Sequence, residues 1–138
     1  MTTSSDRKIS IASKPENINL VERLVDEVKD IYNIREDAYG NILVAVSEAV
    51  NNAICHGNKA NPLKNVDIGY IWKEDLLAFV ISDEGEGFDH YNIPDPTAPE
   101  NIEKPTGRGV FLMKQLSDNV IFSDNGRTVE LYFKISGN

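Results

Sequence analysis

The spacing of the apolar residues changes from a helical to a strand period near Gly57, and this change divides the chain. Before it, Leu20–Tyr32 and Arg35–His56 repeat apolar residues every three or four positions, as helices on a core do. After it, Val66–Trp72 alternates, and Leu76–Ser82 is a nearly continuous apolar run typical of a central strand. This order predicts two helices followed by the strands of a sheet.

Short local signals mark the ends of these elements. Lys8–Ser13 alternates and predicts a first strand. Ser13-Lys14-Pro15-Glu16 has the form of a capping box with proline in the first turn, so we expect the first helix to begin there and to end near Asn33. Gly57-Asn58 is expected to stop the second helix.

The second half adds a long loop, a short helix and a hairpin. Residues 84–107 are rich in glycine and proline and predict a functional loop, expected to be mobile until phosphates order it. Val110–Leu116 predicts a third helix. Ser123-Asp124-Asn125-Gly126 predicts a hairpin turn between Val120–Phe122 and Thr128–Ile135. The expected fold is an α+β two-layer sandwich, with three helices on one face of a mixed, mostly antiparallel sheet.

The composition restricts the class of protein. A chain of 138 residues fits one domain over residues 1–138, and 41% hydrophobic residues can form its core. A net charge of −8 argues against a nucleic-acid partner. Met1–Asp6 is too polar for a signal peptide, and no apolar run approaches a membrane span, so we expect a cytoplasmic protein. Cys55 is expected to be a partly buried helix residue and not a nucleophile.

One face of the second helix carries polar residues that could bind a metal. Glu48 and Asn52 lie four positions apart and are therefore neighbours on this face. A solvated helix face would explain an arbitrary pair of this kind, but the face has little lysine or arginine, and Asn51-Asn52 suits an exposed helix interior poorly. An amide oxygen is a good ligand for Mg²⁺ that also binds substrate phosphates, and the carboxylate could accept a proton.

Two glycine segments carry the other candidate groups. Asp83 follows a buried strand, where its carboxylate could accept a hydrogen bond from an exocyclic amine, and Gly85 and Gly87 would let the backbone approach a planar base. A plain turn would also explain this segment. Gly107-Arg108-Gly109 precedes the third helix, whose N-terminal amides could bind an anion. His56 could contact phosphate, or it could only cap and pack the helix end.

Taken together, these segments resemble the three ATP-site motifs of the Bergerat (GHKL) fold. Glu48-x-x-x-Asn52, Asp83-x-Gly85-x-Gly87 and Gly107-x-Gly109 match them in order. Within that superfamily the chain most resembles the anti-sigma factor serine/threonine kinases. The stretches that carry this likeness are Ser47–Ala53 with His56-Gly57, and Pro96–Asn101 running into Gly107–Met113. The resemblance covers nearly the whole chain.

The resemblance implies a function and a set of site residues. It implies binding of ATP and Mg²⁺, phosphorylation of a serine on a small STAS-type anti-sigma factor antagonist, binding of a sigma factor, and a homodimer. It makes Asn52 the Mg²⁺ ligand, Glu48 the general base and Asp83 the adenine anchor. It assigns the rest of the pocket and the phosphate loop to His56, Gly57, Gly85, Gly87, Phe88, Gly107, Arg108, Gly109, Val110, Phe111 and Thr128. Lys104 and Arg108 are the only cations of the lid segment.

Three alternatives remain open from the sequence. The chain could be the ATP-binding half of a two-component histidine kinase, but only about 14 residues precede the first helix, so the phospho-accepting hairpin would have to come from a partner. It could be a regulatory module that binds nucleotide without phosphotransfer or without a sigma factor, although Glu48 and Asn52 are retained. It could be a scaffold without nucleotide, which leaves the glycine segments unexplained.

Overall fold

The computed structural model describes residues 7–86 and 105–135, with the backbone alone for 105–107. Most of the predicted loop, including Gly87 and Phe88, lies outside this part of the chain. The elements follow the predicted order. They are β1 (Arg7–Ala12), α1 (Ile18–Tyr32), α2 (Glu36–Asn52), β2 (Asn65–Lys73), β3 (Leu76–Ser82), α3 (Pro105–Leu116), β4 (Asn119–Ser123) and β5 (Thr128–Lys134).

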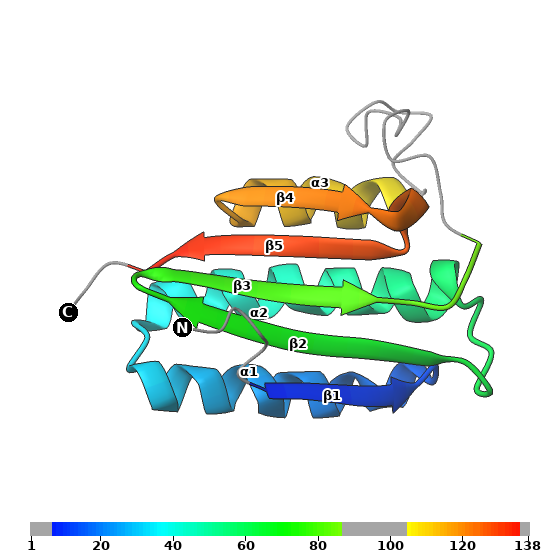
Figure 1. Ribbon diagram of the computed structural model, residues 1–138, viewed down its shortest axis with the longest axis horizontal. Helices are drawn as coiled ribbons and strands as arrows, with labels where there is room; N and C mark the ends of the chain where they lie inside the picture. Colours follow the sequence, from blue (N-terminus) through cyan, green and yellow to red (C-terminus); the bar gives the residue numbers. More distant parts are fainter. Residues whose placement is uncertain (1–6, 87–104, 136–138) are drawn as a thin grey trace.

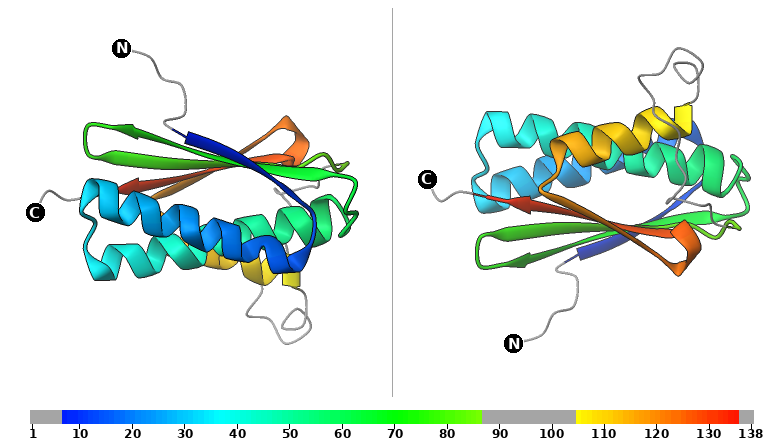
Figure 2. Two further views of the ribbon diagram at one scale, coloured as in Figure 1. Left: turned by 90° about the horizontal axis from the view of Figure 1, so that it is seen from below. Right: turned by 90° about the horizontal axis from the view of Figure 1, so that it is seen from above.

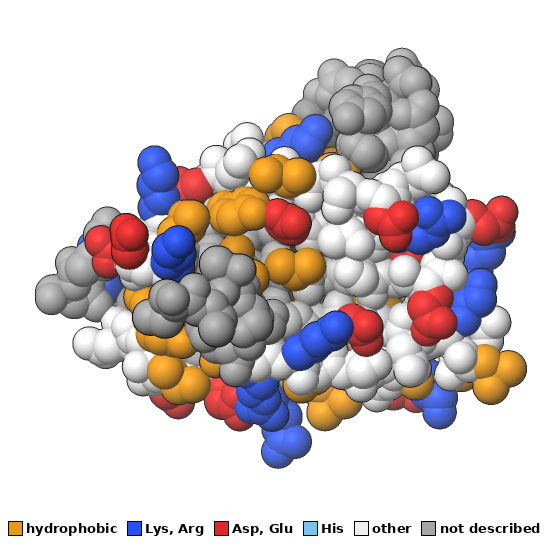
Figure 3. All heavy atoms as spheres, in the orientation of Figure 1, with side chains coloured by type: hydrophobic (Ala, Val, Ile, Leu, Met, Phe, Trp, Pro, Cys, Tyr) orange, Lys and Arg blue, Asp and Glu red, His pale blue; other side chains and the backbone are white. Residues whose placement is uncertain are grey.

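The described strands form one five-stranded sheet in the order β1-β2-β3-β5-β4. We expected a mixed, mostly antiparallel sheet, and all the pairings among these strands are antiparallel. The three helices lie together on one face, which gives the predicted two-layer sandwich (Figures 1 and 2). The opposite face of the sheet, seen in Figure 3, carries charged side chains of both signs among apolar ones.

The core lies between the two layers and confirms the helical and strand periods. Helix α1 buries Val21, Leu24, Val25 and Val28 along one stripe. Helix α2 buries Ile42, Ala45, Val46, Ala49 and Val50, and Leu43 packs against this core while only partly buried. The sheet contributes Ile68, Leu77, Phe79, Ile81 and Leu131, each at most 1% exposed. No helix of the described ranges, 7–86 and 105–135, is long and apolar enough to cross a membrane.

The predicted capping box at Ser13 is wrong. The Ser13 hydroxyl donates to the carbonyl oxygen of Lys64 at 2.7 Å, which ties the end of β1 to the segment before β2. A short 3₁₀ turn, Pro15–Asn17, follows, and α1 begins at Ile18 without a side-chain cap. The predicted end of α1 is confirmed, because Asn33 adopts the left-handed conformation with φ of 52°.

Two further boundaries differ from the prediction. Helix α3 begins at Pro105, so Gly107-Arg108-Gly109 lies inside its start and not before it. Proline suits a first helical position because it has no N–H to leave unpaired there. The last turn of the second helix, Ala53–Gly57, is a π-helical turn, a feature frequent at functional sites. The predicted hairpin joins β4 to β5 through a 3₁₀ turn, Asp124–Gly126.

Candidate functional site

A cavity of about 120 Å³ opens between the end of α2, its π-helical turn, α3 and the ends of β3, β4 and β5. Its walls are mainly apolar, and a few polar groups point to a site for an organic ligand with a flat apolar part. The apolar lining consists of Ala49, Ala53, Ile81, Met113, Phe122 and Val129. The remaining lining residues are Asn52, His56, Gly57, Asp83, Gly126 and Arg127.

Asp83 is the carboxylate of this cavity. It follows β3 directly, and its backbone N–H donates to the carbonyl oxygen of Arg127 at 2.9 Å. The N–H of Gly85 donates to Asp83 Oδ1 at 2.8 Å, which fixes one carboxylate oxygen. Burial raises the pKa of Asp83 above its ordinary value, and the Gly85 N–H and the Arg127 charge oppose this shift in part. The cavity therefore holds an acceptor with one oxygen already oriented.

Two glycines let the π-helical turn pack directly against the loop that carries Asp83. A Cβ on Gly57 would lie 2.4 Å from Asp83 Oδ2, and a Cβ on Gly85 would lie 1.9 Å from the Gly57 carbonyl oxygen. Both distances are far below van der Waals contact, so a side chain at either position would force this contact apart. The glycines permit a close approach of two backbone segments here, and the approach of Gly85 to a planar base stays a prediction.

Asn52 lies where the end of α2 meets the start of α3. Its Nδ2 atom is buried and has no hydrogen-bond partner within the described part of the chain. A Cβ on Gly109 would lie 2.8 Å from this atom, so Gly109 leaves room for the amide. Buried donors without partners are rare in folded proteins, and a bound phosphate or ordered water would satisfy this one.

The oxygen donors near Asn52 suit Mg²⁺ better than a transition metal. Glu48 lies one helical turn before Asn52 and is half-buried, and it does not line the cavity. The described residues contain no cluster of three His, Cys, Asp or Glu that could hold a metal. Mg²⁺ needs few protein ligands, because it keeps several waters and binds substrate phosphates. The residues present therefore fit Mg²⁺ bound together with a nucleotide.

The start of α3 adds backbone amides beside Asn52. The amides of a helix N-terminus attract anions, and Arg108 is exposed there. Gly109 contacts Asn52, whereas Arg108, Val110 and Phe111 do not line the cavity. Val110 belongs to the core, and Phe111 is 40% exposed.

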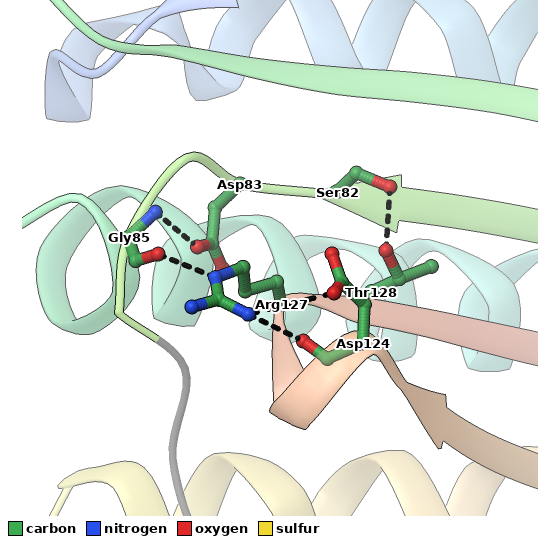
Figure 4. A network of polar contacts seen from close by, with 6 residues as sticks. All are labelled: Ser82, Asp83, Gly85, Asp124, Arg127 and Thr128. Atoms are coloured by element: carbon green, nitrogen blue, oxygen red, sulfur yellow. Dashed lines mark hydrogen bonds and ion pairs between the residues drawn. The ribbon is translucent and has the colours of Figure 1, made fainter.

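Other residues selected from the sequence have different surroundings. Thr128 lies outside the cavity lining, and its hydroxyl is hydrogen-bonded to the Ser82 hydroxyl at 3.0 Å (Figure 4). His56 lines the cavity with an exposed side chain. Cys55, expected to be partly buried, is exposed, because the polar side of the π-helical turn faces solvent.

Two residues of this region were missed by the sequence analysis. Arg127 lines the cavity and contacts the Asp83 loop, yet in the sequence it only follows a turn signal. Asn58 caps the end of the π-helical turn, which confirms the predicted helix stop. It is also buried, and its Nδ2 donates to Ser13 Oγ and to the Asn65 carbonyl oxygen. Its Oδ1 accepts from the Glu84 N–H at 2.8 Å. These contacts join segments that are distant in sequence, so no local pattern could reveal them.

Comparison with known proteins agrees with a cavity that fits a nucleotide. Residues 11–133 match the family described as the histidine kinase-like ATPase domain. The serine-protein kinase RsbW of Oceanobacillus iheyensis is 30% identical over 82% of this chain and 75% of that protein. The proteins of the same name from Staphylococcus aureus and Bacillus licheniformis are 31% and 28% identical. The matches cover 90% and 86% of this chain, and 83% and 79% of those proteins.

Proposed function

This chain belongs to the histidine kinase-like ATPase domain family, and we propose that it is an ATP-dependent protein serine/threonine kinase of the anti-sigma factor type. The family implies ATP binding, and the relatives named above are serine-protein kinases. The substrate is a small STAS-type antagonist protein that accepts phosphate on serine or threonine. A sigma factor is the alternative partner, and the working unit is a homodimer.

The observation that carries this proposal is the pairing of an apolar cavity with two specific polar groups. Asp83 offers a carboxylate at one wall, and Asn52 offers a buried amide near the start of α3. An adenine ring needs apolar contact and an acceptor for its exocyclic amine, and a polyphosphate needs donors and a cation. The two ends of the cavity match these two needs in their chemistry.

At the adenine end of the cavity, side chains of this protein orient the adenine ring. Asp83 Oδ1 is already held by the Gly85 N–H, which leaves the carboxylate able to accept from the amine. Ala53, Ile81 and Met113 provide apolar contact for the ring. A carboxylate that is oriented before the ligand arrives loses little entropy on binding.

At the phosphate end, the side chains supply positive charge and a proton acceptor. Asn52 would hold Mg²⁺, which would neutralise phosphate charge. Arg108 and the amides at the start of α3 bind the phosphates. Glu48 accepts the proton of the attacking hydroxyl group. Phosphoryl transfer depends mainly on such positioning and neutralisation.

The experiment that tests this proposal is transfer of labelled phosphate. The protein is incubated with γ-labelled ATP, Mg²⁺ and small STAS-type candidates, and the label is tested for stability in acid. We expect acid-stable label on a partner serine or threonine and none on this chain, whose only histidines are His56 and His90. Acid-labile label on this chain, with none on a partner, would favour the histidine-kinase alternative.

Glu48→Gln separates binding from transfer in the same assay. This variant should bind nucleotide as the wild type does and lose transfer by about 10²–10⁴-fold, which is the usual contribution of a general base. Asp37→Asn, in the exposed first turn of α2, is the matched control and should keep full transfer. Wild-type transfer in Glu48→Gln would remove Glu48 as the base. Binding of ATP without transfer to any candidate would favour the regulatory module.

A further inference from the structure

We propose that Arg127 is a positioning residue for base recognition, which keeps the Asp83 carboxylate oriented and free to accept the exocyclic amine. This inference rests on the proposed function, since it concerns the same nucleotide site. It adds a residue that no motif of the sequence indicates. Arg127 lies between the hairpin turn and β5, and its side chain reaches the loop that carries Asp83 and Gly85 (Figure 4).

The contacts of Arg127 connect two segments of the cavity wall. Its Nε donates to the Gly85 carbonyl oxygen at 2.7 Å. Its Nη1 donates to the Asp124 carbonyl oxygen at 3.2 Å and lies 3.4 Å from Asp124 Oδ1. Its own carbonyl oxygen accepts from the Asp83 N–H. The side chain thus holds Gly85 in place from the start of β5, the strand that pairs with β3.

This arrangement determines the position of the Gly85 N–H, which is the donor that holds Asp83 Oδ1. The backbone of Gly85 is fixed on both sides of its Cα, because its carbonyl oxygen binds Arg127 and its N–H binds Asp83. Without the guanidinium, the backbone dihedral angles of Gly85 are less restrained, and the carboxylate loses a fixed orienting donor. A fixed acceptor discriminates between ligands better than a mobile one.

The same contacts keep the guanidinium from competing with the ligand. Arg127 forms its ion pair with Asp124, and the structure contains no ion pair between Arg127 and Asp83. The fork of the guanidinium lets Nε and Nη1 bind Gly85 and Asp124 at once, which a lysine ammonium cannot do with the same geometry. The charge of Arg127 stays near Asp83 without occupying its acceptor oxygens.

The test compares ADP with inosine diphosphate, whose base lacks the exocyclic amine. The affinity of each is measured calorimetrically with Mg²⁺ for the wild type, Arg127→Met and Arg127→Lys. The wild type should prefer ADP by on the order of 10²-fold or more, because a site built for a donor rejects an analogue without it. In both variants the ratio of the affinity for ADP to the affinity for inosine diphosphate should fall about tenfold. The fall should come from weaker ADP binding, with the affinity for inosine diphosphate unchanged.

Arg35→Met is the matched control, because Arg35 is exposed and pairs with Asp37 at the start of α2. It should keep the wild-type preference. Equal loss of affinity for both nucleotides in Arg127→Met would show a merely structural role and overturn the proposal. So would a full preference in Arg127→Lys, which keeps the charge without the fork and serves if the methionine variant does not fold. Failure of the wild type to bind ADP would instead contradict the proposed function.

Discussion

At the scale of single residues, Asp83 is subject to opposing influences. Burial disfavours its charged form, while the Gly85 N–H and the Arg127 guanidinium favour it. Burial has the larger effect, so the pKa of Asp83 is raised. Without a ligand the carboxylate therefore destabilises the fold at neutral pH. A hydrogen bond from a donor such as an exocyclic amine would replace the hydrogen bonds from water that the Asp83 carboxylate loses on burial.

The raised pKa predicts how Asp83→Asn changes stability with pH. Below the ordinary value of 3.8, Asp83 is neutral in the folded and unfolded states, so its titration has no effect. As pH rises from there to the raised pKa, the unfolded state ionises first, and the wild type loses stability relative to the variant. Above the raised pKa the difference stays constant. Urea unfolding of both proteins between about pH 3 and 7 measures it.

The control for this prediction is Asp67→Asn, since Asp67 lies on β2 and does not line the cavity. The difference in unfolding free energy between Asp67→Asn and the wild type should not show the pH dependence expected for Asp83→Asn. A difference between the wild type and Asp83→Asn that does not change with pH would show that Asp83 titrates normally in the folded protein.

The sequence predicts some of these residues and not others for a physical reason. Asp83 and Asn52 each stand at the end of a regular element, so the period of the element predicts their placement. Arg127 and Asn58 act through contacts with segments 42 and 45 positions away, and no local pattern contains that information.

At the scale of the elements, the junction of the π-helical turn with the Asp83 loop decides the shape of the cavity. A Cβ on Gly85 would clash with the Gly57 carbonyl oxygen, and a Cβ on Gly57 would clash with the Asp83 carboxylate, so neither position has space for a side chain. The spacing of apolar residues predicted the helices and strands correctly, but it did not predict the start of α3 or the π-helical turn. Helix starts depend on which groups satisfy the first amides, and π-helical turns depend on packing against neighbours.

Two glycine-to-alanine substitutions test this junction with opposite expected results. Gly85→Ala places Cβ 1.9 Å from a backbone oxygen, so we expect a loss of about 1–3 kcal/mol of unfolding free energy. Gly40→Ala lies inside α2 with no atom within 4 Å of its Cβ, so we expect a gain of about 0.5–1 kcal/mol from helix propensity.

Both effects are measured by urea or thermal unfolding. Gly40→Ala should also bind nucleotide as the wild type does, which makes it the control for the helix. If Gly85→Ala were as stable as the wild type and bound ADP equally well, the close contact of the two loops would not matter for the site.

At the scale of the whole molecule, the charge distribution favours a cation in the proposed nucleotide site. The net charge is −8, and the field of such a protein disfavours a polyphosphate at a distance. Helices α1 and α2 add exposed acidic side chains on the helical layer, among them Glu22, Asp26 and Glu36. In the proposed site, local positive charge for the phosphates would come from Mg²⁺, from Arg108 and from the start of α3.

The most direct test of the central claim is calorimetric titration of ATP into this protein with Mg²⁺ and with a chelator. We expect the wild type to bind ATP with Mg²⁺ and to lose at least about tenfold in affinity without it. Asn52→Ala should show the same weak binding in both conditions, while Asn51→Ala, on the exposed side of the same helix, should match the wild type. Equal affinity of the wild type with and without Mg²⁺, or wild-type behaviour in Asn52→Ala, would contradict the account.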